Sequence, residues 1–383
     1  MKKQYIHEKK SSGEKESVAA GIWPGIQLYY PPVKFVPAQG RYENAEEAVM
    51  RLQNHACGSA ADTILFDLED GCHEKNLSRG FLERMLPEYR EKIPGRVALR
   101  INQFGTEEYQ RDLQSLELIG DYVNDVILPK AGELHGASEV QILAEKLEKI
   151  NPKIRIQPIV EHPLSLKIAD ELMANPKVEH IIFGIHDFSR SMSIRLRPEV
   201  WFNQLYPFLC DLLLKARIAG CGVIGGVETL LPEGKISELL PDSDDPSEVR
   251  AAARKDPSLS VVLDHALSES DMGLTGKQVI HPQHIRVCRA AFLEEESELT
   301  RSWQIVEAAN KADAWKGGAI RFENEMMDPP MFTKAMQRII RQTVFKWREE
   351  PLATIKEALE KLPSKVQKEV WPYKSELTLG VKK

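Results

Sequence analysis

Charged side chains recur where short apolar runs of this 383-residue chain end. The residues at these positions are Asp67, Glu69, Asp70, Arg100, Lys130, Glu161, Asp187 and Glu228. In a parallel barrel the carboxyl ends of the strands meet at one face, where barrel enzymes place their active sites. A helix N-cap is the alternative role for any single acidic residue after a strand. The joint pattern favours one shared site.

The acidic pair Glu161 and Asp187 indicates a specific chemistry. Carboxylates at the ends of adjacent strands can bind one divalent cation and leave most of its coordination positions to water and substrate, as is usual for Mg²⁺. Arg100 ends an earlier run, and its planar donors suit a carboxylate or a developing enolate oxygen beside that metal. The three residues predict a Mg²⁺ site for a 2-oxo or 2-hydroxy acid, with Mn²⁺ as the alternative cation.

The apolar runs themselves predict the fold. Eight runs of strand length lie at 33–37, 63–70, 96–102, 125–131, 154–162, 180–188, 220–228 and 276–282. Connecting segments such as 139–150 and 200–219 carry apolar residues at three- and four-residue spacing, which is typical of helices that cover a sheet. Eight such units predict an α/β fold, a (β/α)8 TIM barrel with a helical C-terminal extension. An open doubly wound sheet is the alternative.

The chain divides into three predicted parts. Residues 1–30 are expected to form a mobile tail, 31–300 the barrel, and 301–383 a helical arm that contributes to an oligomer and to the active site. The polar, proline-bearing segment 232–259 predicts a long excursion between the seventh and eighth strands.

Composition excludes several classes of function. The chain has 51 Lys and Arg against 57 Asp and Glu, a net charge of −6, which argues against nucleic-acid and anionic-membrane binding. The five cysteines are scattered and form no C-x-x-C pair, so we expect reduced thiols in a cytoplasmic protein. The N-terminal stretch has no apolar core of a secretory signal. Composition thus leaves a small molecule as the expected partner, with no nucleic acid and no membrane.

Two sequence features could indicate dinucleotide binding or Schiff-base catalysis instead of metal chemistry. Residues 220–225 spell G-x-G-x-x-G, but they follow a predicted helix and enter a predicted strand, the reverse of a dinucleotide loop. Lys130 could form a Schiff base, as in the other class of aldolases. The nearby acidic pair favours metal chemistry instead, so we expect Lys130 in a salt bridge at the rim of the site.

The ordered motifs resemble a known family. They are LFDLEDG, ALRIN, VILPKAGE, IQPIVEH, FGIHDF, GLTGKQVIHPQHI and GGAIRFENEMMDPP. Together they are similar to the HpcH/HpaI aldolase and citrate lyase β-subunit family, which includes citryl-, malyl- and citramalyl-CoA lyases. The resemblance implies a (β/α)8 barrel with Mg²⁺ and a carbon–carbon lyase that works by retro-aldol or retro-Claisen cleavage, or by the reverse condensation.

The resemblance also implies roles for individual residues. Glu161 and Asp187 match the metal ligands, and Arg100 matches the substrate clamp, with Glu69 and Lys130 beside it in the substrate site. Asp70 is the second catalytic candidate. Asp328 matches an aspartate that acts in a neighbouring subunit's site, which makes it the proton-transfer candidate and implies a homo-oligomer, a trimer or a hexamer. The alternative is that Asp328 caps the helix that begins near Pro330.

One departure from the family bears on the substrate. The family's first strand runs into V-P-G and then basic residues that hold CoA, whereas Val36-Pro37-Ala38 here precede Arg41 among acidic residues. Use of a CoA thioester therefore stays open. The alternatives are a non-CoA class II aldolase that acts on a free 2-oxo acid and, from another class, a ligand-binding barrel without turnover.

Overall fold

The computed structural model describes residues 25–234, 236–243, 245–346 and 357–374. Eight parallel strands close into a barrel in the order β1-β10-β9-β8-β7-β6-β5-β4. Their bounds are β1 Gly25–Tyr30, β4 Thr63–Asp67, β5 Arg96–Arg100, β6 Asp125–Leu128, β7 Arg155–Val160, β8 His180–Phe183, β9 Gly222–Gly225 and β10 Gly276–Val279. The predicted barrel is confirmed, and seven of the eight predicted runs contain its strands.

The first predicted strand is wrong. Phe35 and Val36 form β2 (Phe35–Val36), which pairs only with β3 (Arg41–Tyr42) in a small ribbon outside the barrel. Prolines flank this run and remove backbone donors that a central strand needs. The barrel therefore begins at Gly25, inside the range 1–30 predicted as a tail, and the rest of that range lies outside the described residues.

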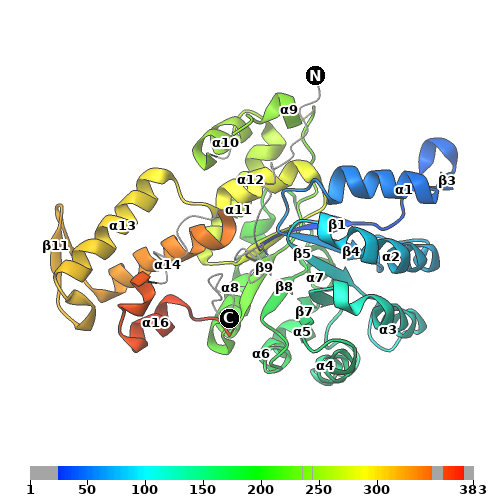
Figure 1. Cartoon of the computed structure of the whole chain (residues 1–383), viewed down its shortest axis with the longest axis horizontal. Helices are drawn as coiled ribbons and strands as arrows, with labels where there is room; N and C mark the ends of the chain where they lie inside the picture. The colour runs from blue at the N-terminus through cyan, green and yellow to red at the C-terminus, as the bar shows by residue number, and fades with distance from the viewer. Residues whose placement is uncertain (1–24, 235, 244, 347–356, 375–383) are drawn as a thin grey trace.

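A ring of helices surrounds the barrel (Figure 1). It consists of α2 Lys75–Tyr89, α3 Glu107–Ile119, α4 Ser138–Ile150, α5 Pro163–Lys167, α6 Ala169–Met173, α7 Ile185–Ser191, α8 Trp201–Ala219, α11 Pro257–Met272 and α12 Pro282–Phe292. The predicted helices at 139–150 and 200–219 are α4 and α8. The excursion between β9 and β10 carries the short helices α9 (Ile236–Leu239) and α10 (Pro246–Ala253), and α1 (Ala45–Arg51) follows β3.

Two apolar layers hold the strands in place. The larger lies between strands and helices. The smaller fills the barrel interior and consists of Leu65, Ala98, Ile127, Ile159, Ile182 and Ile224, with Tyr29 against it. Three glutamines also point into the barrel: Gln27 Nε2 donates to Gln157 Oε1 at 2.8 Å, and Gln278 Nε2 donates to Gln27 Oε1 at 3.1 Å. The packed interior closes the barrel below the strand ends.

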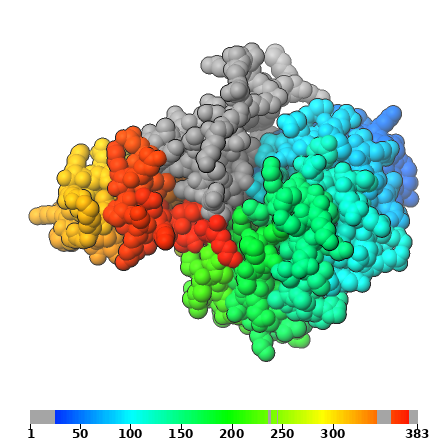
Figure 2. Space-filling model, turned by 60° about the horizontal axis from the view of Figure 1, so that its bottom comes forward, coloured from blue at the N-terminus to red at the C-terminus, as the bar shows by residue number. Residues whose placement is uncertain are grey.

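A helical arm stands to one side of the barrel (Figures 1 and 2). It contains α13 (Glu296–Lys311), the hairpin β11 (Ile320–Phe322) and β12 (Glu325–Met327), α14 (Pro329–Lys346) and α16 (Ser364–Val370). The predicted boundary at 300 falls within α13, which packs against α14, so the arm begins at Glu296. Arg341 of α14 ties the arm to the barrel by donating to the carbonyl and hydroxyl oxygens of Ser270 at 3.0 and 2.7 Å.

Two further observations bear on the excluded functions. The G-x-G-x-x-G sequence joins the end of α8 to β9, a helix-to-strand order that is the reverse of a dinucleotide loop. Within the residues that the structure describes, no helix is both long and apolar enough to cross a membrane.

Candidate active site

A pocket of about 610 Å³ opens at the carboxyl ends of the barrel strands. Its polar lining comes from residues at or just after six strands: Tyr29, Asp67, Arg100, Glu161, Asp187 and Gln278. Asp70 also lines it, and the apolar walls include Ile159 and Ile185. The strand ends thus bring charged groups from distant parts of the sequence into one cavity, which is the usual place for a barrel active site.

Arg100 is fixed by three groups around its guanidinium. Asp67 and Arg100 are register partners on β4 and β5. Nε and Nη2 of Arg100 each lie 2.7 Å from a different oxygen of Asp67, and Nη1 lies 3.2 Å from Glu69 Oε2. The ring of Tyr29 covers one face, with its centroid 4.8 Å from Arg100 Cζ. Burial opposes the charged form, but Tyr29 and these carboxylates hold the pKa of Arg100 well above its ordinary value.

The segment after β4 presents the neighbouring carboxylates. The backbone N–H groups of Glu69 and Gly71 donate to the two oxygens of Asp67, both at 3.0 Å, which folds 67–71 into a tight turn. A side chain at Gly71 would displace the carboxylate of Asp67, because a Cβ would lie 2.3 Å from Asp67 Oδ2. The turn leaves Glu69 buried and Asp70 exposed at the pocket.

Lys130 links this turn to the other side of the site. Its ammonium contacts Glu69 Oε1 and lies 3.5 Å from Asp70 Oδ2, while its backbone N–H donates to Glu161 Oε1. The backbone of Lys130 adopts φ 50°, a left-handed conformation that is uncommon for a non-glycine residue. The predicted salt bridge is present, and a Schiff-base role has no support. Glu69 and Lys130 lie behind the pocket lining, where they contact the residues that form it.

The pKa values of the buried Glu69 and the exposed Asp70 in this turn are shifted in opposite directions. Burial raises the pKa of Glu69 and outweighs the effects of Arg100 and Lys130. Burial also opposes ionisation of Asp70, but there Lys130 and Arg100 prevail and lower the pKa. The surroundings therefore favour the ionised form of Asp70 more than that of Glu69.

Glu161 and Asp187 fit an oxygen-ligated cation. Glu161 follows β7 and is 5% exposed, and Asp187 lies in the first turn of α7, with Oδ1 2.5 Å from Arg190 Nη2. Burial, Asp187 and Glu69 raise the pKa of Glu161 to about 8 against the hydrogen bond from Lys130. A buried carboxyl among other carboxylates is stabilised in its charged form by a cation. Gly184 makes room for Glu161, because a Cβ there would lie 2.8 Å from Glu161 Cβ.

The donor set suits Mg²⁺ rather than a structural metal. Within the described residues, no group of three or more His, Cys, Asp or Glu side chains could hold a metal. A hard cation such as Mg²⁺ is commonly bound through one or two carboxylates, with the remaining positions left to water and substrate.

Asp328 lies outside this constellation. It is exposed at the start of α14, directly after the hairpin of the arm, and it does not line the pocket of its own chain. Its backbone carbonyl accepts from Met331 N and Phe332 N at 3.0 and 3.2 Å, so its backbone opens the helix. The chain thus brings together six of the seven predicted site residues and leaves Asp328 apart.

Three lining residues received no role from the sequence. Asp67 ends a predicted strand, but only the register of β4 and β5 shows that it holds Arg100. Tyr29 was missed because β1 was misplaced. Gln278 lies in β10, and its Oε1 accepts from the Tyr29 hydroxyl at 3.1 Å. The signal for Tyr29 is its position at the end of an apolar run just before Pro31.

A basic rim borders the mouth of the pocket. It consists of Lys34, Arg51, His55 and His281. Arg51 is anchored by Glu43 at 2.7 Å, and the ring of His281 accepts from Gln283 N at 3.3 Å. Because β1 ends at Tyr30, the chain runs from a strand through Pro31-Pro32 to a basic residue. The departure at 36–38 that counted against CoA therefore reflects the misplaced first strand.

Comparison with known proteins bears on this geometry. The family described as HpcH/HpaI aldolase/citrate lyase matches residues 45–233. A (3S)-malyl-CoA thioesterase of Cereibacter sphaeroides is 24% identical over 295 residues, 76% of this chain and 89% of the relative. An L-malyl-CoA/beta-methylmalyl-CoA lyase of the same organism is 24% identical over 303 residues, 74% of this chain and 88% of the relative.

A solved structure shares the fold. The protein CitE from Mycobacterium tuberculosis, determined with magnesium, acetoacetate and coenzyme A, superimposes with a TM-score of 0.58 at 22% identity. The alignment covers 84% of this chain and 99% of that one. The sequence family and the named relatives agree: residues 45–233 match the HpcH/HpaI aldolase/citrate lyase family, and the chain is similar to enzymes of that family over about three quarters of its length.

Proposed function

We propose that this chain is a Mg²⁺-dependent carbon–carbon lyase that cleaves a hydroxy or 2-oxo acid or its CoA thioester, or forms it by the reverse condensation. The observation that carries the proposal is the convergence, in one pocket, of a rigidly held Arg100 with the acidic pair Glu161 and Asp187. Cleavage of a bond beside a carbonyl leaves an enolate, and this charge needs positive groups already in position. The names of the relatives support the same class of reaction.

The two acidic residues would hold the cation. When bound there, a divalent cation supplies Lewis-acid stabilisation of negative charge on substrate oxygens. Glu161 and Asp187 contribute the anionic oxygens, and the backbone N–H of Lys130 orients Glu161. Ile159 and Ile185 add apolar surface to the lining beside these two residues.

Besides the cation, the site contains a fixed positive side chain, Arg100. Three of its donors bind Asp67 and Glu69, so the guanidinium loses little further side-chain freedom when a ligand binds. It can hold a substrate carboxylate and stabilise enolate charge. Asp70, kept ionised by Lys130 and Arg100, is placed at the pocket to accept a proton or to order water.

The basic rim supports a CoA thioester as the substrate form. Lys34, Arg51, His55 and His281 line the pocket, and the positive side chains of Lys34 and Arg51 favour phosphate groups. The thioester end of such a substrate would point inward to Arg100. The names of the curated relatives, which carry malyl-CoA, agree with this assignment.

We also propose that the active form is a homo-oligomer in which Asp328 acts in the pocket of another copy. Asp328 is exposed, stands on an arm beside the barrel, and is absent from the lining of its own pocket. Delivery by a neighbouring subunit would add the missing group for proton transfer.

A product assay tests the lyase directly. The purified chain is incubated with malyl-, citramalyl- or citryl-CoA, and separately with free 4-hydroxy-2-oxo acids, in Mg²⁺ and then in excess EDTA. Chromatography should detect a shorter acyl-CoA with a stoichiometric 2-oxo acid, or acetyl-CoA with oxaloacetate from citryl-CoA, only with Mg²⁺. Release of free CoA without carbon–carbon cleavage would indicate a thioesterase and overturn the proposal. Turnover of the free acids alone would support the alternative of a non-CoA aldolase. If no substrate is turned over, the alternative of a ligand-binding barrel without turnover is supported.

A further inference from the structure

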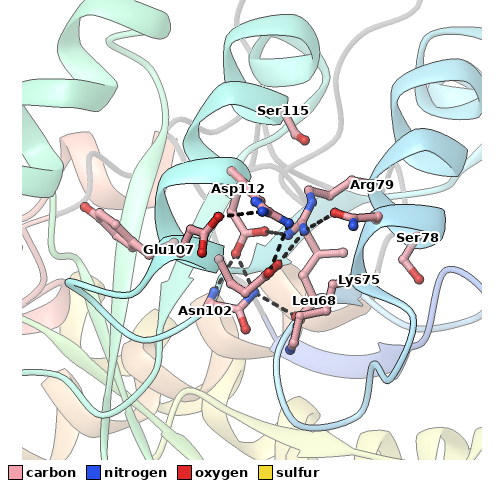
Figure 3. Close-up of polar contacts among 12 residues, drawn as sticks. Leu68, Lys75, Ser78, Arg79, Asn102, Glu107, Asp112 and Ser115 are labelled. Carbon is pink, nitrogen blue, oxygen red and sulfur yellow. Dashed lines mark hydrogen bonds and ion pairs between the residues drawn. The ribbon is translucent and has the colours of Figure 1, made fainter.

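A buried polar cluster lies behind the turn that carries Glu69 (Figure 3). We call it the bracket, and it consists of Lys75, Arg79, Asn102 and Asp112. Arg79, Asn102 and Asp112 are 5%, 6% and 0% exposed. The bracket joins α2, α3 and the loop after β5, and none of its members lines the pocket.

Asp112 is the centre of the bracket. Its Oδ2 accepts from the backbone and side-chain nitrogens of Asn102 at 2.6 and 2.7 Å, and its Oδ1 accepts from Arg79 Nη1 at 2.6 Å. These bonds compensate a carboxylate that is completely removed from water. They also fix the side chain of Asn102 in one orientation.

The bracket binds the turn from its outer side. Asn102 Nδ2 donates to the carbonyl oxygen of Leu68 at 2.9 Å. Lys75 Nζ donates to the carbonyl oxygens of Leu68 and Glu69, both at 2.8 Å. Figure 3 shows Asn102, Leu68 and Asp112 meeting at this point.

The inner side of the same turn contacts the catalytic groups. The side chain of Glu69 lies between Arg100 and Lys130. The turn is therefore held between the bracket and the pocket, and a shift of the Leu68 and Glu69 carbonyls moves the carboxylate that supports Arg100. Buried ion pairs are a weak source of stability compared with apolar packing. The contacts of the bracket with the turn therefore point to a geometric role.

We propose that Asn102 and Asp112 are positioning residues: they set the place of Glu69 and, through it, the orientation of Arg100 and Lys130. The kinetic part of this inference rests on the proposed lyase function. The structural part, that Asn102 immobilises the turn, does not depend on any reaction.

The test combines hydrogen exchange with a double-mutant cycle. Asn102→Ala removes the side-chain bonds to Leu68 and Asp112 and keeps the backbone bond to Asp112. Ser115→Ala is the matched control, because Ser115 is buried in the same helix pair and donates to Glu83 Oε1 at 2.6 Å without contacting the turn. We expect amides 69–71 to exchange at least tenfold faster in Asn102→Ala than in Ser115→Ala.

The kinetic cycle separates positioning from general destabilisation. Asn102→Ala, Glu69→Gln and the double variant are compared by kcat/KM. We expect Asn102→Ala to lower kcat/KM at least tenfold, and much less when Glu69 is already changed, because residues that act through one group are not additive. Additive losses, or exchange at 69–71 equal to that of the control, would overturn the inference.

A milder variant covers the case in which Asn102→Ala does not fold. Lys75→Met removes the other donor to the same carbonyls from a partly exposed position, and the same exchange and cycle results are expected. If the wild-type protein shows no lyase turnover in the product assay, the proposed function is refuted before any variant is compared. The exchange measurement would still decide whether the bracket holds the turn.

Discussion

Asp67 and Arg100 face each other across β4 and β5 and form a two-pronged ion pair, with both N–O distances at 2.7 Å. The pair is largely buried, so each partner depends on the other for compensation of its charge. A guanidinium fixed in this way is oriented before substrate arrives, which is what stabilisation of a developing charge requires.

Replacing Arg100 with lysine tests that orientation. Arg100→Lys keeps the charge but cannot bind both oxygens of Asp67 in the same geometry. We expect kcat/KM to fall roughly 100- to 1000-fold, the cost of losing a charge-stabilising donor. Arg111→Lys is the control, because Arg111 lies at the surface, where it pairs with Glu107 and Glu108 outside the pocket. A variant with near wild-type kcat/KM would remove Arg100 from the mechanism.

The aromatic ring under Arg100 makes a second prediction. Tyr29→Phe keeps the ring face and loses only the hydroxyl bond to Gln278, so we expect kcat/KM within about threefold of wild type. Tyr29→Leu removes the cation–π contact and should lower kcat/KM by roughly three- to thirtyfold. Steady-state measurement of kcat/KM for both variants and the wild type, on the same substrate, tests this prediction. Equal kinetics for the Phe and Leu variants would show that the ring face does not support Arg100.

The proposed shared site is tested by complementation. Asp328→Ala and Glu161→Gln protomers are each expected to be inactive. When they are mixed and reassembled, some pockets will have an intact Glu161 and receive an intact Asp328 from the other protomer, so part of the activity should return. Native mass spectrometry verifies the mixed oligomers. If verified mixtures stay inactive, or if the wild type is monomeric and active, Asp328 does not act across subunits.

His284 makes a prediction about stability and pH. It is fully buried, with Nε2 2.9 Å from the carbonyl oxygen of Leu230, and burial and the nearby His281 lower its pKa to about 4. An unfolded histidine has a pKa of about 6.5. Between these values the unfolded chain binds a proton that the folded chain does not, so stability falls as the pH drops from about 6.5 to about 4.

Urea unfolding at pH 7.5 and pH 5 measures this contribution. The wild type should lose about 2 kcal/mol more than His284→Gln, which keeps a donor for Leu230 but does not titrate. His180, whose pKa burial lowers to about 3, contributes in the same direction to both proteins and cancels in the comparison. Equal losses in the two proteins would show that His284 does not titrate in this way.

The fold could be predicted from the sequence because seven barrel strands are apolar runs buried on both faces. The eighth, β1, was missed because a second run of strand length, 33–37, lies only a few residues beyond it, and no local pattern shows which of the two runs pairs into the barrel.

The site was predictable to the extent that it depends on strand ends. Arg100, Glu161 and Asp187 each lie at or just after a strand, and parallel strands converge there. The pairing of Asp67 with Arg100 depends on strand register, which no local pattern encodes. The same holds for Asn102 and Asp112, whose contacts form only when α3 packs behind the turn.

Binding of Mg²⁺ measured by titration calorimetry tests the central claim most directly. The account predicts one site in the wild type and a loss of affinity of at least roughly a hundredfold in both Glu161→Gln and Asp187→Asn, because even changes around metal ligands commonly cost up to that much. Glu133→Gln, a nearby carboxyl that does not line the pocket, should bind Mg²⁺ like the wild type. Unchanged Mg²⁺ binding in both site variants would contradict the assignment of Glu161 and Asp187 as the metal site.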